Sequence, residues 1–453
     1  MVSNFISQSL GECCDILTGF PFKSSNYSEE DKSIKLLRGD NIIQGSLRWE
    51  GVKRWDQSQL TNDLNDKYSL LEKDVVLAMD RPWIEAGLKY ASISSDDLPC
   101  LLVQRVCRIR AKKNLHQQFL KYVIADKRFT SYVLSIQTGT TIPHISSKQI
   151  AEYQFALPPI DQQKAISHIL GTLDKKIELN KKTNKTLKEI SKTIFKSWFI
   201  DFDPVKAKAE DRSSGLPDEI IDLFPNSFVD SELGKIPIGW EIVSLGDIYS
   251  KGKGGTWGSD NKKNDSPKSF SCLRGVDCHK LSMGGMHNAP KRFIKESHYE
   301  GRIPQQYSLL IEGSGSFCGR SLLWEKKYHQ LTGKEVFYSN FCKRLDPIAN
   351  LSYSPIAWMF MLSAYEKGIM ANYRTGTAFP NLDINGVLLN LKIVLPPLDL
   401  AIIFESIFQS QNRVDLISNS ESLRKLRTIL LDKLVTGKLK ITDIEKMVEE
   451  VGI

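Results

Sequence analysis

The residue patterns nearest to a catalytic motif are two Leu-Pro-Pro triplets, which begin at Leu157 and Leu395. Adenine methyltransferases hold a flipped base with an (Asp/Asn)-Pro-Pro-aromatic motif, whereas aliphatic residues flank both proline pairs here. The glycine-rich run EGSGSFCG at residues 312–319 lacks a clear preceding strand and following helix, so it indicates no nucleotide site. The chain has no GxxxxGK(S/T) loop, and no nuclease-type Glu-x-Lys follows Pro217-Asp218 closely. We therefore predict no catalytic residues.

Metal ligation is not indicated either. The sequence has no HExxH, no CxxC and no Cys/His cluster at zinc spacing. We predict no metal site and reduced thiols at the eight cysteines, which are Cys13, Cys14, Cys100, Cys107, Cys272, Cys278, Cys318 and Cys342.

Composition is that of a folded protein of several domains. At 453 residues the chain is long enough for about three folding units, and 41% hydrophobic with 25% charged residues is near the globular average. Lys and Arg exceed Asp and Glu by 61 − 53 = 8, which permits a polyanionic partner without requiring one. No signal peptide or apolar run of about 20 residues occurs, so we expect a cytoplasmic protein without a membrane partner.

A tandem repeat organises the sequence. Four short matches recur at separations of 236 to 239 residues: LRG at 37 and 273, YSLL at 68 and 307, TGT at 138 and 375, and LPP at 157 and 395. LGE at 10 and LGD at 245 extend the repeat to the start of each copy. The sequence between the shared matches differs between the two copies. This is expected of two modules that share a scaffold but bind different targets through their loops. The alternative is an old duplication followed by neutral drift.

A long helical stretch follows each Leu-Pro-Pro, over about 160–199 and about 398–434. In the first, apolar and Asn residues alternate steps of four and three, which is typical of a coiled-coil seam; Ile190, Ile194 and Trp198 continue it. We expect the two helices to pack antiparallel, each about 60 Å long, with the asparagines helping to fix the register; the alternative is ordinary core helices. The seam residues are Ile166, Leu170, Leu173, Ile177, Asn180, Asn184 and Leu187.

The predicted fold class is α+β, because short β-rich runs such as 101–110 and 389–395 mix with helical runs such as 117–134. We predict two globular domains in tandem, joined by the two antiparallel helices. The expected boundaries are 1–157 for the first domain, 158–202 for the central helix, 203–239 for a linker rich in Pro and Gly, 240–395 for the second domain, and 396–453 for the C-terminal helix and tail.

Three segments carry a resemblance to a known family. LPPIDQQKAISHILGTLDKKIELN (157–180), WFIDFDPVKAK (198–208) and FPNSFVDSELGKIPIGWE (224–241) resemble the central region of specificity subunits of type I restriction-modification systems. TGTTIPHI (138–145), TGTAFPNL (375–382) and KLVTGKLKI (433–441) are similar to other recurrent parts of that family. LPPLDLAIIFESI (395–407) departs from the usual Gln-rich start, which puts only the C-terminal helix contacts in doubt.

The resemblance implies a non-catalytic subunit with two target-recognition domains, each reading half of a bipartite, asymmetric site in double-stranded DNA. It further implies two modification (methyltransferase) subunits that carry S-adenosylmethionine and methylate adenine, and restriction subunits that use ATP and magnesium as motor and nuclease. This chain is then expected to hold no cofactor.

Loop residues of the types that read base edges or hold phosphates are the candidate DNA-binding residues. The alternative is that the Thr-Gly-Thr tokens are fold-defining turns and that Trp83 and Trp257 are packing aromatics. In the first domain the candidates are Arg38, Asp40, Asn41, Lys53, Arg54, Arg81, Trp83, Gln137, Thr138, Thr140, Thr141 and His144; in the second they are Lys251, Lys253, Thr256, Trp257, Arg274, Arg320, Arg374, Thr375, Thr377 and Asn381.

Two other classes stay open at this point. One is an enzyme, either methyltransferase or nuclease, with a divergent catalytic motif fused to recognition domains. The other is a coiled-coil scaffold without a role on DNA.

Overall fold

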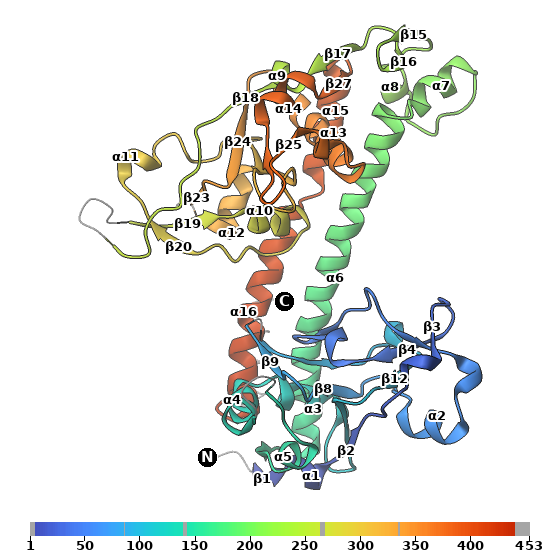
Figure 1. The fold of residues 1–453 in the computed structure, drawn as a ribbon, viewed down its shortest axis with the longest axis vertical. Coiled ribbons are helices and arrows are strands. Elements are labelled where there is room, and N and C mark those ends of the chain that lie inside the picture. The colour runs from blue at the N-terminus through green and yellow to red at the C-terminus, as the bar shows by residue number, and fades with distance from the viewer. Residues whose placement is uncertain (1–4, 86, 139–142, 263–267, 334–335, 440–453) are drawn as a thin grey trace. The chain divides into compact units, whose positions relative to one another are not determined.

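The computed structural model describes residues 5–85, 87–138, 143–262, 268–333 and 336–439. It divides into two compact units (Figure 1): unit 1 comprises Met1–Lys175 with Arg424–Ile453, and unit 2 comprises Lys176–Leu423. Both units mix helices with small sheets, so the fold class is α+β as predicted.

Unit 1 is built on a four-stranded antiparallel sheet in the order β11-β8-β13-β2. Its central strands, β8 (Val75–Ala78) and β13 (Val106–Ala111), are rich in buried apolar residues, which suits a sheet covered on both faces. A second sheet, β12-β4-β7-β3, contains the parallel pair Cys100–Leu102 and Ile34–Leu37. The strands β1 and β14, which lie at the two ends of the first repeat copy, pair antiparallel in a separate two-stranded sheet. The other strands are β1 (Ile6–Ser9), β2 (Cys14–Thr18), β3 (Tyr27–Ser28), β5 (Ile42–Ile43), β6 (Ser46–Leu47), β7 (Arg54–Trp55), β9 (Trp83–Ile84), β10 (Gly87–Leu88), β11 (Tyr90–Ser92) and β14 (Gln154–Leu157).

Unit 2 repeats this topology. Its main sheet has the order β18-β24-β21-β22, which corresponds strand for strand to β2-β13-β8-β11. The parallel pair recurs as β19 with β23, and Leu273 faces Tyr338 where Leu37 faces Leu102 in unit 1. The tandem repeat predicted from four short tokens is therefore confirmed as a repeat of fold. The strands of unit 2 are β15 (Phe228–Ser231), β16 (Gly234–Pro237), β17 (Glu241–Ser244), β18 (Tyr249–Lys251), β19 (Ser269–Leu273), β20 (Lys291–Phe293), β21 (Leu309–Glu312), β22 (Ser321–Leu323), β23 (Val336–Tyr338), β24 (Cys342–Pro347), β25 (Arg374–Thr375), β26 (Asn381–Leu382) and β27 (Lys392–Leu395).

Short helices occupy equivalent places in the two units. Near the start of each repeat copy lies a one-turn helix that begins after a serine in a capping box, Ser9 with Glu12 in unit 1 and Ser244 with Asp247 in unit 2. These are the LGE and LGD tokens of the sequence. The helices are α1 (Leu10–Cys13), α2 (Asn62–Tyr68), α3 (Gln117–Ala125), α4 (Lys127–Ile136) and α5 (Ser147–Ala151) in unit 1, and α7 (Asp203–Ala209), α8 (Asp218–Ile221), α9 (Leu245–Ile248), α10 (Gly275–Ser282), α11 (Glu296–Tyr299), α12 (His329–Thr332), α13 (Tyr353–Glu366), α14 (Ile384–Asn390) and α15 (Leu398–Ser410) in unit 2.

The first long helix, α6 (Ile160–Phe199), has the predicted bounds. The second differs from the prediction of one helix over 398–434: α15 ends at Ser410 and α16 runs over Arg413–Val435. The break lies at Asn412, whose φ of 47° is left-handed and interrupts the helical ladder. Likewise the run 117–134 forms two helices, because Asp126 caps the second with its side chain.

Polar side chains hold α6 against α16 within unit 2. Asn180 donates to the Asn419 side chain at 2.9 Å, and Asn184 donates to the Arg413 carbonyl at 2.9 Å. Residue numbers rise on one helix as they fall on the other, so this pair is antiparallel, as predicted. Ile190 is 44% exposed, however, and its predicted place in the seam is taken by the buried Ser191, which bonds Gln411.

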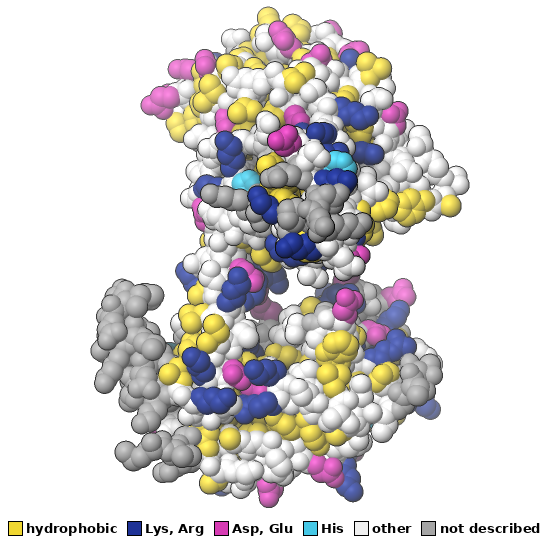
Figure 2. Space-filling model, turned by 90° about the vertical axis from the view of Figure 1, so that its left-hand side faces the viewer, with side chains coloured by type: hydrophobic (Ala, Val, Ile, Leu, Met, Phe, Trp, Pro, Cys, Tyr) yellow, Lys and Arg dark blue, Asp and Glu magenta, His cyan; other side chains and the backbone are white. Residues whose placement is uncertain are grey.

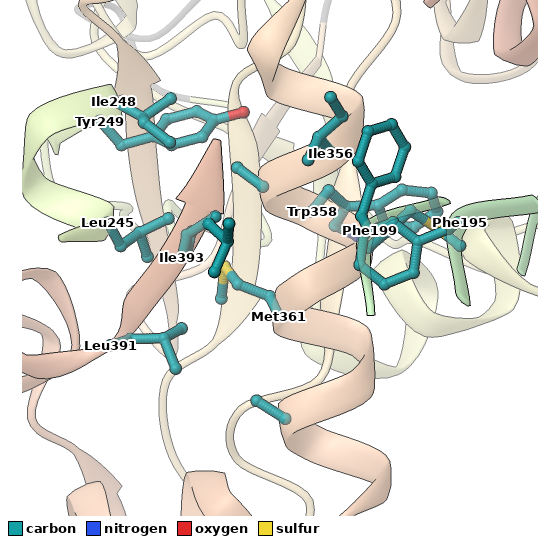
Figure 3. Close-up of a cluster of buried hydrophobic side chains, with 14 of the residues drawn as sticks. Phe195, Phe199, Leu245, Ile248, Tyr249, Ile356, Trp358, Met361, Leu391 and Ile393 are labelled. Carbon is teal, nitrogen blue, oxygen red and sulfur yellow. The ribbon is translucent and has the colours of Figure 1, made fainter. Parts of the chain in front are cut away.

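Residues 203–239, expected to be a linker, are folded instead. They form α7, α8 and the β15–β16 hairpin, and they bury Val205, Phe224 and Ile236 in the core of unit 2. The aromatic side chains Phe195 and Phe199 of α6 complete this core (Figure 3). Both contact Phe404 of α15, and Phe195 also contacts Phe360 of α13. The fold unit thus includes part of the predicted central helix.

The core of unit 1 likewise uses both long helices. Ile166 and Leu170 of α6 and Leu431 and Leu434 of α16 are buried with the apolar faces of α3 and β13. Asp174 of α6 bonds Lys121 at 2.7 Å and Arg427 at 2.5 Å, and opposite charge on these two groups holds the pKa of Asp174 below its ordinary value against burial, which raises it. The ends of both helices are therefore part of the unit and not separate spacers.

Candidate nucleic-acid interface

Three loops meet at one end of the main sheet in unit 1. They are residues 79–84 after β8, residues 103–105 before β13, and the two described ends of the segment 138–145. Backbone hydrogen bonds join them: Met79 donates to Arg105 at 2.8 Å, Arg81 to Pro143 at 2.7 Å, and Ile145 to Met79 at 3.0 Å. Because each loop is fixed to a strand of the sheet, the side chains they carry are held on a rigid support.

We call the three loops and the backbone hydrogen bonds that join them the frame. In unit 1 the frame carries charged side chains. The Asp80 carboxylate lies 2.5 Å from His144 Nδ1 and 3.2 Å from Arg105 Nη1. Arg81 and Arg105 both adopt left-handed backbone conformations, with φ of 45° and 69°. Such conformations cost of order 1–3 kcal/mol each and cluster at functional sites, so these two positions are candidates for a role beyond folding.

A hollow of about 320 Å³ opens beside this group. Its lining includes four cationic and two acidic side chains, so it favours an anion or the electronegative edge of a base. Burial lowers the pKa of Lys89, and the nearby Arg81 and Arg48 add to that effect while Asp40 and Asp80 oppose it. The lining residues are Phe22, Tyr27, Arg38, Gly39, Asp40, Asp80, Arg81, Lys89, Val103, Gln104 and Arg105.

Unit 2 has the same frame of backbone hydrogen bonds. Gly313 donates to Phe341 at 2.8 Å, Gly315 to Pro380 at 2.8 Å, and Leu382 to Gly313 at 2.9 Å. These correspond one for one to the three bonds of unit 1, and the bridge between Ser314 and Asn381 corresponds to that between Asp80 and His144. The glycine-rich run 312–319 is therefore one loop of this frame.

The side chains on the two frames differ. Where unit 1 has Asp80, Arg81, Arg105 and His144, unit 2 has Ser314, Gly315, Phe341 and Asn381. One backbone arrangement thus presents two chemically distinct surfaces, which is the property expected of two readers built on one scaffold.

The predicted residues of unit 1 fall into two groups. Arg38, Asp40 and Arg81 line the hollow, and Thr138 and His144 lie on the frame beside it. The remaining described candidates lie elsewhere in the unit: Asn41 is buried and bonds the backbone of Arg38 and Arg48, Arg54 donates to Ser33, Lys53 and Gln137 are at the surface, and Trp83 is 41% exposed on β9. Thr140 and Thr141 lie outside the described residues.

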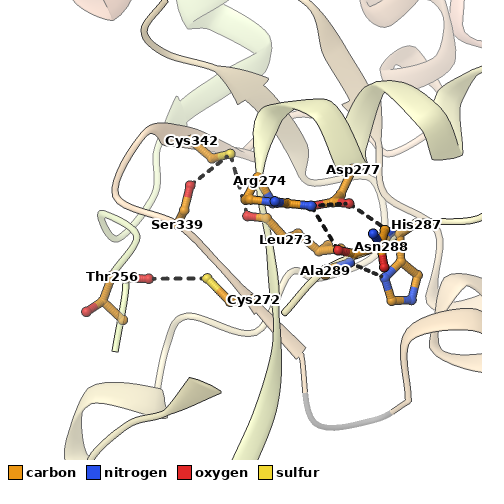
Figure 4. Close-up of polar contacts among 10 residues, drawn as sticks. All are labelled: Thr256, Cys272, Leu273, Arg274, Asp277, His287, Asn288, Ala289, Ser339 and Cys342. Carbon is orange, nitrogen blue, oxygen red and sulfur yellow. Dashed lines mark hydrogen bonds and ion pairs between the residues drawn. The ribbon is translucent and has the colours of Figure 1, made fainter. Parts of the chain in front are cut away.

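In unit 2 several predicted arginines are held by neighbours. Arg274 bonds the buried Asp277 at 2.8 Å and the Asn288 carbonyl at 2.8 Å (Figure 4). Burial raises the pKa of Asp277, but the hydrogen bonds that it accepts from Arg274 and from the Asn288 amide hold that pKa below its ordinary value. Arg320 is paired with Glu312 at 2.7 Å, and Arg374 donates to the Cys318 carbonyl.

The other candidates of unit 2 lie at or near its surface. Thr375, Thr377 and Asn381 are exposed on the third loop of the frame. Trp257 is 38% exposed beneath the guanidinium of Arg292, 4.5 Å from the ring centroid. Lys251 is exposed, Lys253 donates to the Glu300 carbonyl at 2.9 Å, and the Thr256 amide donates to Tyr338.

Sequence reasoning missed several residues that the fold places at the frame. Lys89, Gln104 and Arg105 line the hollow of unit 1, and Phe317, Phe341 and Phe379 lie on the loops of unit 2. Superposing the two copies at the offset of the LRG tokens, 236 residues, would have paired Arg105 with Phe341 and marked both as positions where a shared frame changes its filling.

Within the described residues, no group of three or more His, Cys, Asp or Glu side chains could hold a metal ion. All eight cysteines belong to the described part of the chain, where they are buried and unpaired. No helix among the described residues is both long and apolar enough to cross a bilayer. Figure 2 shows one face of the molecule, on which Lys and Arg side chains lie in small groups with acidic side chains among them.

The sequence matches known proteins of one kind. Residues 4–189 match the family model described as the type I restriction modification DNA specificity domain. The chain is 33% identical over 186 residues to the EcoAI specificity subunit of Escherichia coli, and 26% identical over 370 residues to the MjaIX specificity subunit of Methanocaldococcus jannaschii. Residues 4–189 are thus similar to the DNA specificity domain of type I restriction-modification systems.

The extent of these matches differs. The match to the Escherichia coli protein covers 41% of this chain but only 30% of that protein's length, whereas the match to the Methanocaldococcus protein covers 79% of this chain and 77% of that one. Among solved structures, the S subunit of a type I restriction-modification system from M. genitalium covers 95% of this chain and 96% of its own, with a TM-score of 0.52 and 14% identity. That likeness shows the specificity-subunit fold for the chain.

Proposed function

We propose that this chain is the DNA-recognition subunit of a type I restriction-modification complex, and that it binds a bipartite, asymmetric target. One observation carries the proposal: the two units share three corresponding backbone hydrogen bonds but differ in the side chains that these bonds position. Each unit then reads one half of the target, and the halves differ because the side chains differ.

Unit 1 supports direct reading of bases. Arg38, Arg81 and Arg105 beside one hollow are the residue type that most often contacts guanine in the major groove, and Asp80 is an acceptor of the kind that bonds cytosine N4. The net charge of the chain is a modest +8, which is compatible with base contacts at a few positions and additional contacts with phosphates. The phosphate contacts contribute affinity and make it depend on salt.

Catalysis is assigned to partners. The sequence contains no motif for S-adenosylmethionine chemistry, ATP hydrolysis or phosphodiester cleavage. We therefore assign adenine methylation to two modification subunits that bind S-adenosylmethionine, and translocation and cleavage to restriction subunits that bind ATP and magnesium. This chain recognises the target sequence in double-stranded DNA.

Arg105→Ala tests the proposal in the first unit. The Arg105 side chain is 61% exposed and lines the hollow, so its loss should weaken binding of the target by about 1–3 kcal/mol and relax the preference at one base pair. The measurement is selection of DNA from a random pool by the full chain assembled with its modification subunits, followed by titration of the selected duplex.

Lys113→Ala is the matched control, since Lys113 is exposed beyond the opposite end of β13. It should change neither sequence preference nor affinity by more than a few tenths of a kcal/mol. Absence of any selected sequence would contradict the proposal and favour a scaffold; methylation or cleavage by the chain alone would favour an enzyme.

A further inference from the structure

Three phenylalanines stand exposed on the three frame loops of unit 2. Phe317, Phe341 and Phe379 are 55%, 51% and 60% exposed, and the ring centroids of Phe341 and Phe379 are 6.4 Å apart. The guanidinium of Arg320 lies over the Phe317 ring, 4.3 Å from the ring centroid. We call these three residues the phenylalanine cluster. Exposed aromatic side chains add little to the stability of the fold, because aromatic side chains stabilise a protein by being buried.

The loops that carry the cluster are not free to collapse onto the core. Each is fixed by the frame bonds from Gly313 to Phe341, from Gly315 to Pro380 and from Leu382 to Gly313. The rings therefore project from the loops that correspond to those of the charged group in unit 1, and Arg105 occupies the place of Phe341.

Charge at the centre of this surface is neutralised within the protein. Arg320 and Glu312 pair at 2.7 Å, and each side chain is only 14% exposed. Burial raises the pKa of Glu312, and the hydrogen bond and charge of Arg320 oppose that rise. The exposed surface of the loops therefore includes the three rings, with the Lys343 side chain beside Gly313 and the Asn381 side chain, which donates to the Phe379 carbonyl.

On the edges of base pairs in the major groove, the apolar feature is the thymine methyl group, and phenylalanine is one of the side chains that contact it. Asparagine is the residue type that bonds adenine, the partner of thymine, on the same edge. We infer that the phenylalanine cluster contacts thymine methyl groups of the half-site that unit 2 reads. This inference rests on the proposed function and adds the class of base that one unit recognises.

Replacing thymidine by deoxyuridine tests the contact, because it removes the methyl group and leaves base pairing unchanged. The full chain, assembled with its modification subunits, is titrated with duplexes of the mapped target in which each thymine is replaced singly. At the thymines in contact we expect affinity to fall about three- to five-fold, the value of one buried methyl-sized group. Thymines read by unit 1 should show no dependence on the cluster.

Phe341→Ala and Phe379→Ala supply the second arm. Both side chains are exposed, so the fold should be retained, which thermal unfolding checks. With these variants the thymine duplex should bind more weakly and the uracil substitution should cost nothing further. Ile348→Ala is the matched control: Ile348 is 59% exposed at the other end of β24, and its removal should leave the uracil effect intact.

The outcomes separate the two proposals. If no specific DNA is bound by the assembled complex, the proposed function fails. If specific DNA is bound, the inference is overturned by a unit 2 half-site without thymine, or by a uracil effect of equal size in the wild type and the phenylalanine variants.

Discussion

Close approach of backbone at two equivalent glycines fixes the start of each domain. A Cβ added at Gly19 would lie 2.2 Å from the Val103 carbonyl oxygen, and one added at Gly255 would lie 2.1 Å from the Ser339 carbonyl oxygen. Neither distance is possible for a real side chain. The backbone at Gly19 can therefore approach the turn before β13, and the backbone at Gly255 the turn before β24, only because glycine has no Cβ.

Gly255→Ala should therefore destabilise unit 2 by about 1–3 kcal/mol, because the obstructing atoms are backbone and cannot rotate away. Gly254→Ala is the matched control, since an added Cβ there meets no heavy atom within 4 Å. Chemical denaturation of the two variants, followed by fluorescence, measures the difference. Equal stabilities would show that the segment shifts freely and that the close approach is not required.

Some residues of the candidate interface could be predicted from sequence and others could not. Arg38 and Arg81 were predicted because loop arginines in a basic chain indicate DNA contact, and the fold places both at one hollow. Phe341 and Phe379 were missed because phenylalanine normally indicates packing. Only the backbone frame, which depends on bonds between residues far apart in sequence, shows that they are exposed together.

At the scale of elements, the seam of α6 is polar in unit 2. Lys188 is 8% exposed, and its Nζ lies 2.8 Å from the Met283 sulfur. Burial lowers its pKa to about 8, and Arg413 and Lys192 reinforce this, while Glu366 and Glu189 act in the opposite direction. An unfolded lysine has its ordinary pKa near 10.4.

The sign of the pH effect follows from this lowered pKa. Between about pH 8 and pH 10.4 the unfolded chain binds a proton at Lys188 that the folded chain lacks, so the free energy of unfolding gains a contribution that rises with pH there. Lys188→Met should remove that rise and stabilise unit 2 at pH 7 by up to about 3 kcal/mol. Lys185→Met, exposed one turn earlier, should leave the rise in place. Denaturation midpoints at pH 7, 9 and 10 measure the effect, and an unchanged pH profile in Lys188→Met would contradict it.

The elements were largely predictable where the backbone itself dictates residue type. Leu-Pro-Pro marked the start of α6 and α15, and LGE and LGD marked the start of each repeat copy, where the structure has α1 and α9. The break at Asn412 was missed because the apolar spacing continues on both sides of it, and a single left-handed residue leaves no periodic signal. The linker prediction failed for a related reason: prolines suggested an open chain, although Val205 and Phe224 are buried.

At the scale of the whole molecule, the central claim is that two copies of one frame read two half-sites independently. Its basis is the correspondence of the frame bonds and bridges, with Asp80 and His144 in unit 1 and Ser314 and Asn381 in unit 2. Each of these bonds and bridges joins two residues of the same unit. A substitution in one unit should therefore not alter the bases that the other unit reads.

The most direct measurement is the DNA sequence selected from one random pool by three assembled complexes, carrying the wild-type chain, His144→Ala or Asn381→Ala. Both side chains lie at equivalent bridges, so each variant is the control of the other. We predict that His144→Ala relaxes base preference in one half of the target only, and Asn381→Ala in the other half only. Relaxation of both halves by either variant, or of the same half by both, would contradict the account.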